Sequence, residues 1–145
     1  MTLTRALVLD ANILIRAVLG KRVRSLIETY GERMRFFTPD VCVQSAHDYL
    51  PDLARRRGWP VEDALTLLAH VSAWIEIVEA DLYTDFEASA KARMVGRDED
   101  DWPVAAVALA LDSPIWTEDR DFFGVGIATW TTALVELYLS GTSRA

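Results

Sequence analysis

The chain has 145 residues, of which 51% are hydrophobic and 26% are charged. This length and balance predict a single globular domain over residues 1–145 and exclude a disordered chain. The net charge of −7 disfavours a simple nucleic-acid-binding module, which needs positive charge to neutralise phosphates.

Other broad features indicate a protein of the cytoplasm. Cys42 is the sole cysteine, so no disulfide can form within the chain and no cluster of thiolates can hold a metal. The strongly apolar stretch 102–111 is too short for a membrane span, which takes about 20 residues. The first residues lack the pattern of an export signal. We therefore expect a cytoplasmic protein with no membrane partner.

Short apolar runs suited to strands alternate with segments of helical periodicity. In chain order, we expect strands at 6–9, 34–37, 74–78, 114–117 and 127–129. Helices are expected over 12–19, 21–30, 40–57, 60–73, 80–94, 103–111 and 131–139. Gly20 and Gly31 suit the ends of the first two helices, and Pro103 suits the first turn of the sixth. Strands that alternate with helices indicate a parallel α/β sheet, whose ligand site lies beyond the carboxyl ends of the strands.

Three aspartates stand beside hydrophobic runs that should become neighbouring elements of this fold. Asp10 and Asp119 follow predicted strands, and Asp101 precedes a predicted helix. Each one alone is explained by helix capping or by an Asx turn, both common roles for aspartate. If folding brings all three to one edge of the sheet, their carboxylates form a site for a hard divalent cation. Such a site suggests phosphodiester chemistry.

The residues around these aspartates resemble the three signatures of the PIN-domain ribonucleases. The matching segments are 7–15 (LVLDANILI), Asp101 followed by Ala105 and Ala108, and 117–122 (TEDRDF). The resemblance extends from Val8 to about Thr132 and implies an α/β fold, a compact three-layer α/β/α sandwich around a central parallel sheet. It also implies an endoribonuclease that uses Mg²⁺ or Mn²⁺ to hydrolyse the phosphodiester bonds of an RNA substrate.

Carried over to this chain, the resemblance assigns roles to six residues. It makes Asp10, Asp101 and Asp119 the catalytic and metal-binding aspartates, Asp121 an additional outer acid, and Asn12 and Thr117 supporting polar residues. Other readings stay open for the last three. Asp121 could be a solvent-facing loop acid, Asn12 a helix cap and Thr117 a strand-end hydroxyl.

One position departs from the family's pattern. The family places a second acid, usually Glu, on the helix after the second strand, where this chain has Gln44 or Ser45. Asp48 lies one helical turn from Gln44 on roughly the same face. It is therefore a candidate metal ligand beside a supporting Gln44, or else an ordinary surface acid. Loss of one carboxylate would weaken cation affinity and could leave one metal ion rather than two.

The resemblance also bears on partners and on competing functions. Many small bacterial members of that family are toxins neutralised by an antitoxin protein, and a homodimer is a further candidate assembly. The main alternative is a PIN-like scaffold without catalysis that binds RNA or a protein partner. A haloacid-dehalogenase-type phosphotransferase needs a second Asp where this chain has Asn12. A receiver-like domain needs a lysine after a late strand, which this chain lacks.

Basic residues form two groups along the sequence. The first comprises Arg16, Lys21, Arg22 and Arg24, and the second comprises Arg55, Arg56 and Arg57. The simplest reading of both groups is a solvated helix face.

Overall fold

A five-stranded parallel sheet forms the centre of the computed structural model, which describes residues 5–141. The strands are β1 (Arg5–Leu9), β2 (Met34–Pro39), β3 (Ile75–Val78), β4 (Ile115–Trp116) and β5 (Thr129–Trp130), in the spatial order β3-β2-β1-β4-β5. β1 pairs with β2 on one side and with β4 on the other, where Leu9 lies opposite Trp116. The strand order therefore reverses between β1 and β4. In parallel sheets a ligand crevice lies at such a reversal, beyond the carboxyl ends of the strands.

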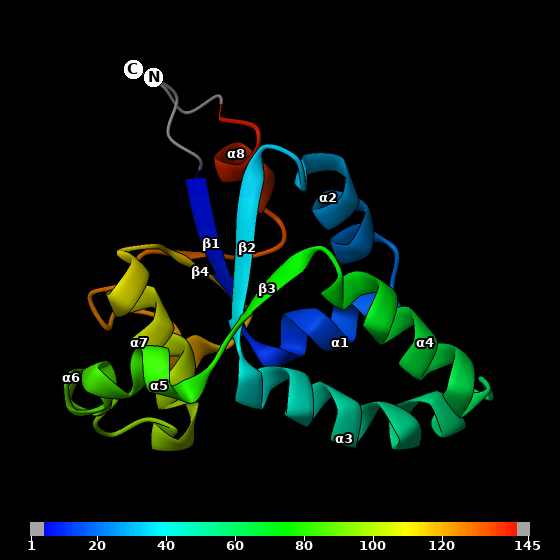
Figure 1. Ribbon diagram of the computed structural model, residues 1–145, viewed down its shortest axis with the longest axis horizontal. Helices are drawn as coiled ribbons and strands as arrows, with labels where there is room; N and C mark the ends of the chain where they lie inside the picture. Colours follow the sequence, from blue (N-terminus) through cyan, green and yellow to red (C-terminus); the bar gives the residue numbers. More distant parts are fainter. Residues whose placement is uncertain (1–4, 142–145) are drawn as a thin grey trace.

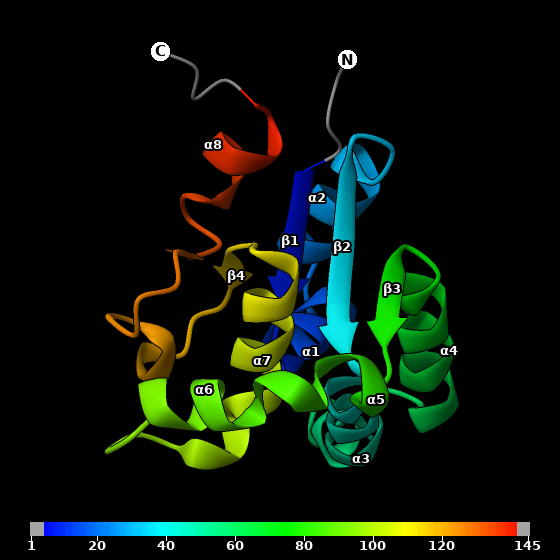
Figure 2. The same ribbon diagram turned by 60° about the vertical axis from the view of Figure 1, so that its left-hand side comes forward.

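Helices cover both faces of the sheet. They are α1 (Ala11–Leu19), α2 (Arg22–Tyr30), α3 (Asp40–Arg56), α4 (Val61–Ser72), α5 (Ala80–Tyr83), α6 (Glu87–Arg93), α7 (Trp102–Leu111) and α8 (Val135–Leu139). Figure 1 shows α1 to α4 on one side of the sheet and α5 to α7 on the other. Figure 2 shows α7 in front of β1, with α1 and α2 behind the sheet. The predicted three-layer α/β/α sandwich is confirmed.

The most apolar helix, α7, is the one that packs against the middle of the sheet. Its residues from Pro103 to Ala108 are all buried, and it contacts both β1 and β2. A helix that is apolar all round has to be buried on every side. Its small alanines let the helix lie close to Leu7 and Val8, which are fully buried in β1. The amino-terminal end of α7, where Asp101 stands, is therefore held by the core.

The segment 80–94 was predicted as one helix, and this prediction is wrong. The structure divides it into α5, a 3₁₀ turn η1 (Thr84–Phe86) and α6. The Thr84 hydroxyl donates a hydrogen bond to the carbonyl of Ala80, a pattern that bends helices. The buried Tyr83 also donates its hydroxyl to the Asp40 carboxylate at 2.7 Å, which ties this corner to α3. A tertiary contact and a side-chain hydrogen bond thus override the local periodicity.

The carboxyl-terminal elements are shorter than expected. The last strand lies at Thr129–Trp130 rather than 127–129, and the last helix begins at Val135 rather than residue 131. The backbone N–H of Thr132 donates to the Glu118 carboxylate at 2.6 Å. That bond holds 131–134 in turns after the edge strand. Within the described part of the chain, no helix has both the length and the apolar character needed to cross a membrane.

Candidate metal site at the sheet edge

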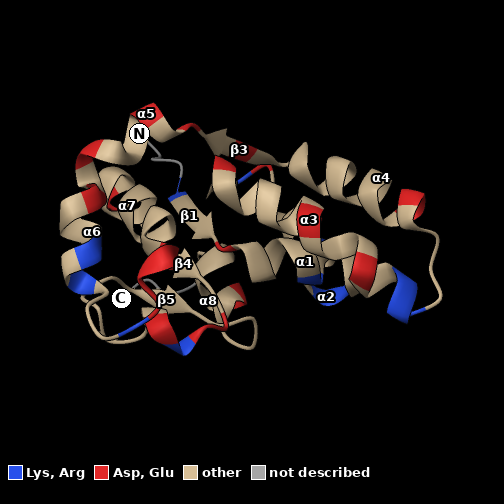
Figure 3. Ribbon diagram, turned by 90° about the horizontal axis from the view of Figure 1, so that it is seen from below, with Lys and Arg blue, Asp and Glu red and all other residues tan. Residues whose placement is uncertain are grey.

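The carboxyl edge of the sheet gathers the three aspartates singled out in the sequence. Asp10 follows β1, Asp119 follows β4, and Asp101 directly precedes α7. All three line one cavity of about 390 Å³, together with Asp98 and Asp100. We call this the carboxylate cavity. Figure 3 views the molecule from this edge and shows acidic segments close to β4, whereas the basic ends of α3 and α6 lie at the periphery.

Asp10 is both a helix cap and a member of the cavity. Its Oδ1 accepts a hydrogen bond from the backbone N–H of Ile13 at 3.0 Å, and its Oδ2 accepts one from the Thr117 hydroxyl. Its side chain is nearly fully buried. Burial raises the pKa of Asp10 to about 6, although the bonds from Thr117 and Ile13 act in the opposite direction. Capping and a role in the site are therefore compatible for this residue.

Thr117 connects the ends of β1 and β4. While its hydroxyl donates to Asp10, the same oxygen accepts from the backbone N–H of Asp119 at 2.9 Å. Asp119 in turn accepts from the backbone N–H of Asp121 at 2.9 Å, which is the Asx-type turn expected there. Thr117 is fully buried, so these bonds fix the relative positions of the two carboxylates.

Asp101 is where the negative charges of the cavity converge. Its side chain makes no capping hydrogen bond to α7, so capping does not explain its position. The pKa of Asp101 is raised to about 7, first by burial and then by the charges of Asp98, Asp119 and Asp10. A hydrogen bond with Asp119 also favours the protonated form. Crowded carboxylates of this kind are stabilised by a bound cation.

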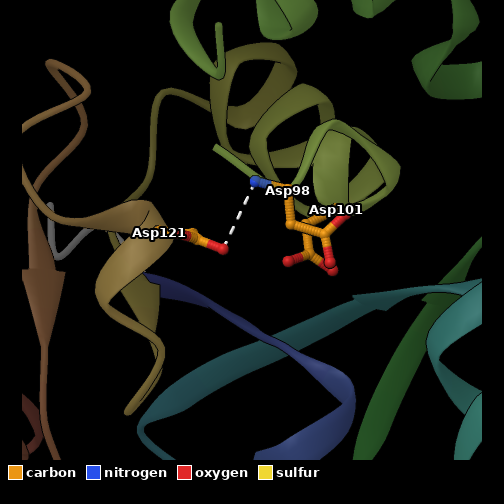
Figure 4. A group of neighbouring side chains, drawn as sticks. All are labelled: Asp98, Asp101 and Asp121. Carbon is orange, nitrogen blue, oxygen red and sulfur yellow. Dashed lines mark hydrogen bonds between the residues drawn. The ribbon is translucent and has the colours of Figure 1, made fainter. Parts of the chain in front are cut away.

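Asp98 belongs to this cluster, although the sequence treated it as part of a loop. One carboxylate oxygen each from Asp98, Asp101 and Asp121 lies within 4.8 Å of the others. Figure 4 shows Asp98 and Asp101 extending from one segment and Asp121 approaching from the facing loop. The backbone N–H of Asp98 also donates to the Asp121 carboxylate at 3.3 Å. The available signal was the spacing of Asp98 and Asp101, which stand three residues apart across the 3₁₀ turn η2 (Glu99–Asp101).

The donor atoms of this cluster fit a hard divalent cation. Carboxylate oxygens are the ligands that Mg²⁺, Mn²⁺ and Ca²⁺ prefer. Among residues 5–141, no lysine or arginine lines the carboxylate cavity and neutralises it. Cys42 does line it, but burial raises the pKa of this thiol to about 12, so it stays neutral and is not a thiolate ligand. The ligand roles of the individual aspartates stay predictions.

Helix α3 contributes only uncharged side chains to the cavity. They are Val41, Cys42, Ser45 and Tyr49. Of the two positions considered for the family's second acid, Ser45 faces the cavity and Gln44 does not. Gln44 is exposed and donates its amide to Asp48 at 2.9 Å, and Asp48 is exposed as well. The structure therefore does not bring Gln44 or Asp48 to the carboxylate cavity, whereas exposed Asn12 on α1 does line it.

Two arginines hold the loop that carries Asp119 and Asp121. Arg97, next to Asp98, donates to the backbone carbonyl of Asp121 at 2.9 Å and also to that of Phe123. Arg93 donates to the carbonyl of Val125 at 2.9 Å, farther along the same loop. Arg97 therefore couples the two segments whose carboxylates meet at the cluster. Sequence reasoning did not identify this residue, since an arginine bonded to carbonyls has no local signature.

A carboxylate-lined cavity at the reversal point of a parallel sheet defines an α/β protein with the donor set of a divalent-cation site. A family model described as "PIN domain" matches residues 8–140. The chain belongs to the PIN domain family, and the resemblance found in the sequence is confirmed.

Solved structures share the fold at low sequence identity. PAE2754 from Pyrobaculum aerophilum has 18% identity and a TM-score of 0.72, covering 95% of this chain and 91% of its own. A chain of VapBC2 from Rickettsia felis, bound to a DNA fragment from their promoter, has 12% identity and a TM-score of 0.64, covering 87% and 98%. A chain of FitAB bound to an IR36 DNA fragment has 19% identity and a TM-score of 0.54, covering 87% and 94%. No curated protein matches the chain in sequence.

Proposed function

We propose that this protein is a metal-dependent endoribonuclease that hydrolyses RNA phosphodiester bonds at the carboxylate cavity. The observation that carries the proposal is the meeting of Asp98, Asp101 and Asp121 within 4.8 Å at a cavity also lined by Asp10 and Asp119. The family to which the chain belongs supports the same reaction class. Five carboxylates without a neutralising side chain need a cation before an RNA phosphate can approach them.

The residues of the carboxylate cavity have different roles in the proposed reaction. Asp101, with Asp98 and Asp121 or with Asp10 and Asp119, would hold Mg²⁺ or Mn²⁺. The chemistry that such an ion supplies is polarisation of the scissile phosphate and a lower pKa for a bound water. Thr117 orients the Asp10 carboxylate through its hydroxyl, and hydrogen bonds to a metal-binding carboxylate fix its geometry. Asn12, exposed at the cavity, offers an amide to a phosphate oxygen or to water.

The proposal is tested with the purified protein and a single-stranded RNA, with Mg²⁺ or Mn²⁺ and with EDTA. We expect cleavage only with the metal, and a loss of about a hundredfold or more in Asp101→Asn and in Asp10→Asn. Asp63→Asn, which changes an exposed acid on α4, is the matched control and should cleave normally. Equal cleavage by all four proteins, or cleavage in EDTA, would contradict the assignment of this site.

A second candidate function is a PIN scaffold that binds RNA or a protein without cutting RNA. It is motivated by the uncharged α3 wall, where Ser45 stands in place of a second acid. Titration calorimetry with Mn²⁺ separates the two functions. Absence of metal binding by a folded protein that still captures RNA would favour the scaffold.

The partner of such a nuclease would be an antitoxin. Two of the similar structures, VapBC2 and FitAB, are bound to DNA fragments. Many small bacterial members of the family that the sequence resembles are toxins neutralised by an antitoxin, and we extend this context to the present chain as part of the proposal. Co-expression with the product of a neighbouring short reading frame would test it. We expect a stable complex that suppresses RNA cleavage, and size-exclusion chromatography of the chain alone would show whether it forms a homodimer.

A further inference from the structure

A second concave region, lined by cations, lies at the carboxyl-terminal end of α1, whereas the carboxylate cavity lies at the amino-terminal end of this helix. The second region has a volume of about 700 Å³ and is lined by Arg16, Lys21, Arg22 and Arg57, among others. We call it the basic cleft. Arg16 comes from the last turn of α1, Lys21 and Arg22 from the start of α2, and Arg57 from the carboxyl-terminal cap of α3. Folding therefore joins the two basic groups that are separate in the sequence.

The cations of these two groups are not equivalent. Arg24 donates to the carbonyls of Ala17, Val18 and Gly20, so it closes the end of α1 and has a structural role. Arg22 is paired with Glu136 at 3.1 Å.

Arg16, Lys21 and Arg57, in contrast, form no ion pair with any carboxylate of residues 5–141. In a protein with a net charge of −7, three cations that share one concavity without an ion pair indicate a site for an anion.

One face of α1 connects the basic cleft to the carboxylate cavity. Asn12 and Ile15 line the carboxylate cavity, and they also line a third concavity that includes Arg16. Arg16 and Leu19 then line the basic cleft. These four residues have the spacing of a single helix face. Three concavities that share lining residues therefore follow one another along α1 from the aspartates to the cations, and we call this series the groove.

We infer that the basic cleft binds the phosphodiester backbone of the RNA strand on one side of the bond that is cut. This inference rests on the proposed function, because the groove has to lead to a site of RNA cleavage. From Asn12 to Leu19 the helix rises about 10 Å at about 1.5 Å per residue. That length matches about three phosphates of a stacked strand at about 3.4 Å each. Ile15 and Leu19, half-buried between the polar residues, give the bases an apolar surface.

An RNA strand explains this groove better than an acidic peptide does. A peptide carboxylate would be satisfied by the basic cleft alone. The groove instead continues to a second site whose donor set suits a metal ion and a phosphate. The positive cleft supplies the attraction that an acidic protein otherwise lacks for a polyanion.

The test measures binding rather than cleavage, so that it does not depend on catalysis. A short fluorescein-labelled single-stranded RNA is titrated with the full chain in the presence of Ca²⁺, which neutralises the cavity carboxylates, and anisotropy is followed over a range of salt concentrations. The test variant is Arg16→Gln/Arg57→Gln. The matched control, Arg5→Gln/Arg33→Gln, removes the same charge from two arginines that likewise form no ion pair within residues 5–141 and lie at the amino-terminal ends of β1 and β2.

We expect the test variant to bind about tenfold more weakly at low salt. Its slope of log affinity against log salt should fall by about 1.4, at about 0.7 for each lost cation. The control should match the wild type. Equal affinity and slope in both double variants, or no RNA binding by the wild type, would overturn the inference. The inference would also be overturned if an acidic peptide, and not RNA, bound the wild type and bound Arg16→Gln/Arg57→Gln more weakly.

The same RNA, incubated with Mg²⁺ or Mn²⁺ in a parallel assay, keeps this inference distinct from the proposed function. RNA binding that depends on Arg16 and Arg57, without cleavage of the RNA, would support the basic cleft and contradict the proposed nuclease activity. Cleavage that is unchanged in Arg16→Gln/Arg57→Gln would support the nuclease activity and contradict a role of the basic cleft in RNA binding.

Discussion

The two walls of the carboxylate cavity differ in charge. The wall formed by the segments around α7 and β4 carries Asp98, Asp101 and Asp119, whereas α3 contributes only uncharged residues such as Ser45. The charged wall is also fixed by hydrogen bonds through Thr117 and Arg97. Metal affinity should therefore depend on the geometry of the first wall, while the second wall offers space in which charge can be added.

The largest change in metal affinity should come from removing a hydrogen bond that holds the charged wall. We expect Arg97→Ala to weaken Mn²⁺ binding by about tenfold or more, the usual cost of losing a hydrogen bond that holds metal-binding residues in place. The reason is that the loop carrying Asp121 loses its donor from the segment of Asp98. Titration calorimetry measures the affinity, and thermal unfolding measures stability. Arg93→Ala, which frees a carbonyl farther along the same loop, should reduce stability without this loss, and equal affinity loss in both variants would refute the argument.

Adding charge to the uncharged wall should strengthen metal binding. Ser45→Glu adds a carboxylate on the α3 wall of the cavity, and we expect Mn²⁺ affinity to rise by about tenfold because affinity follows the number of ligand charges. The matched control is Gln44→Glu, which adds the same charge at an exposed position outside the cavity. Calorimetry on both variants would show whether Ser45 is the position that faces the site. A larger gain of Mn²⁺ affinity in Gln44→Glu than in Ser45→Glu would contradict the position of Ser45 at the cavity and of Gln44 outside it.

The crowding of carboxylates should make the metal-free protein less stable at higher pH. The folded-state pKa is raised to about 6 for Asp10 and to about 7 for Asp101. A raised pKa gives a contribution that is complete below the ordinary value near 4 and is lost as the pH rises through 6 to 7. The free energy of unfolding in EDTA should therefore fall between about pH 4 and about pH 7.

Two comparisons check this pH dependence by chemical denaturation. Asp101→Asn in EDTA should be about 1 kcal/mol more stable than the wild type near pH 8, a modest value because the side chain is half-exposed. Added Mn²⁺ should stabilise the wild type and not this variant. A wild-type free energy of unfolding that rises across the same pH range would contradict the raised pKa values of Asp10 and Asp101.

The smallest effect is expected for Asp48→Asn. Asp48 is exposed, bonded to Gln44 and outside the carboxylate cavity. Its neutralisation should leave Mn²⁺ affinity and RNA cleavage within about twofold of the wild type. A loss comparable to that of Asp101→Asn in the same cleavage assay would make Asp48 the replacement for the family's second acid after all.

The sequence predicted the sheet and most helices because their apolar runs are long and regular. It failed at 80–94, where the Tyr83 hydroxyl bonds to Asp40 across the structure. At the site, the positions of Asp10 and Asp119 after strands and of Asp101 before a helix were sufficient to place all three on one edge.

Other features of the site depend on contacts that no local pattern records. A step of one residue turns a helix by about 100°, so the choice between Gln44 and Ser45 needed the actual packing of α3. The sequence predicted Asp98 as part of a solvated acidic loop, because nothing in its local pattern indicates that Asp121 lies beside it in the fold. The joining of Arg16 and Arg57 depends on where α3 ends relative to α1.

Because α7 has no polar side, the position of Asp101 is set from inside the molecule. Any change that shifts this helix, such as a bulkier residue at Ala105 or Ala106, would move a surface carboxylate without touching the surface. Temperature-sensitive behaviour of the protein could therefore be engineered from positions that no substrate, ion or partner ever reaches.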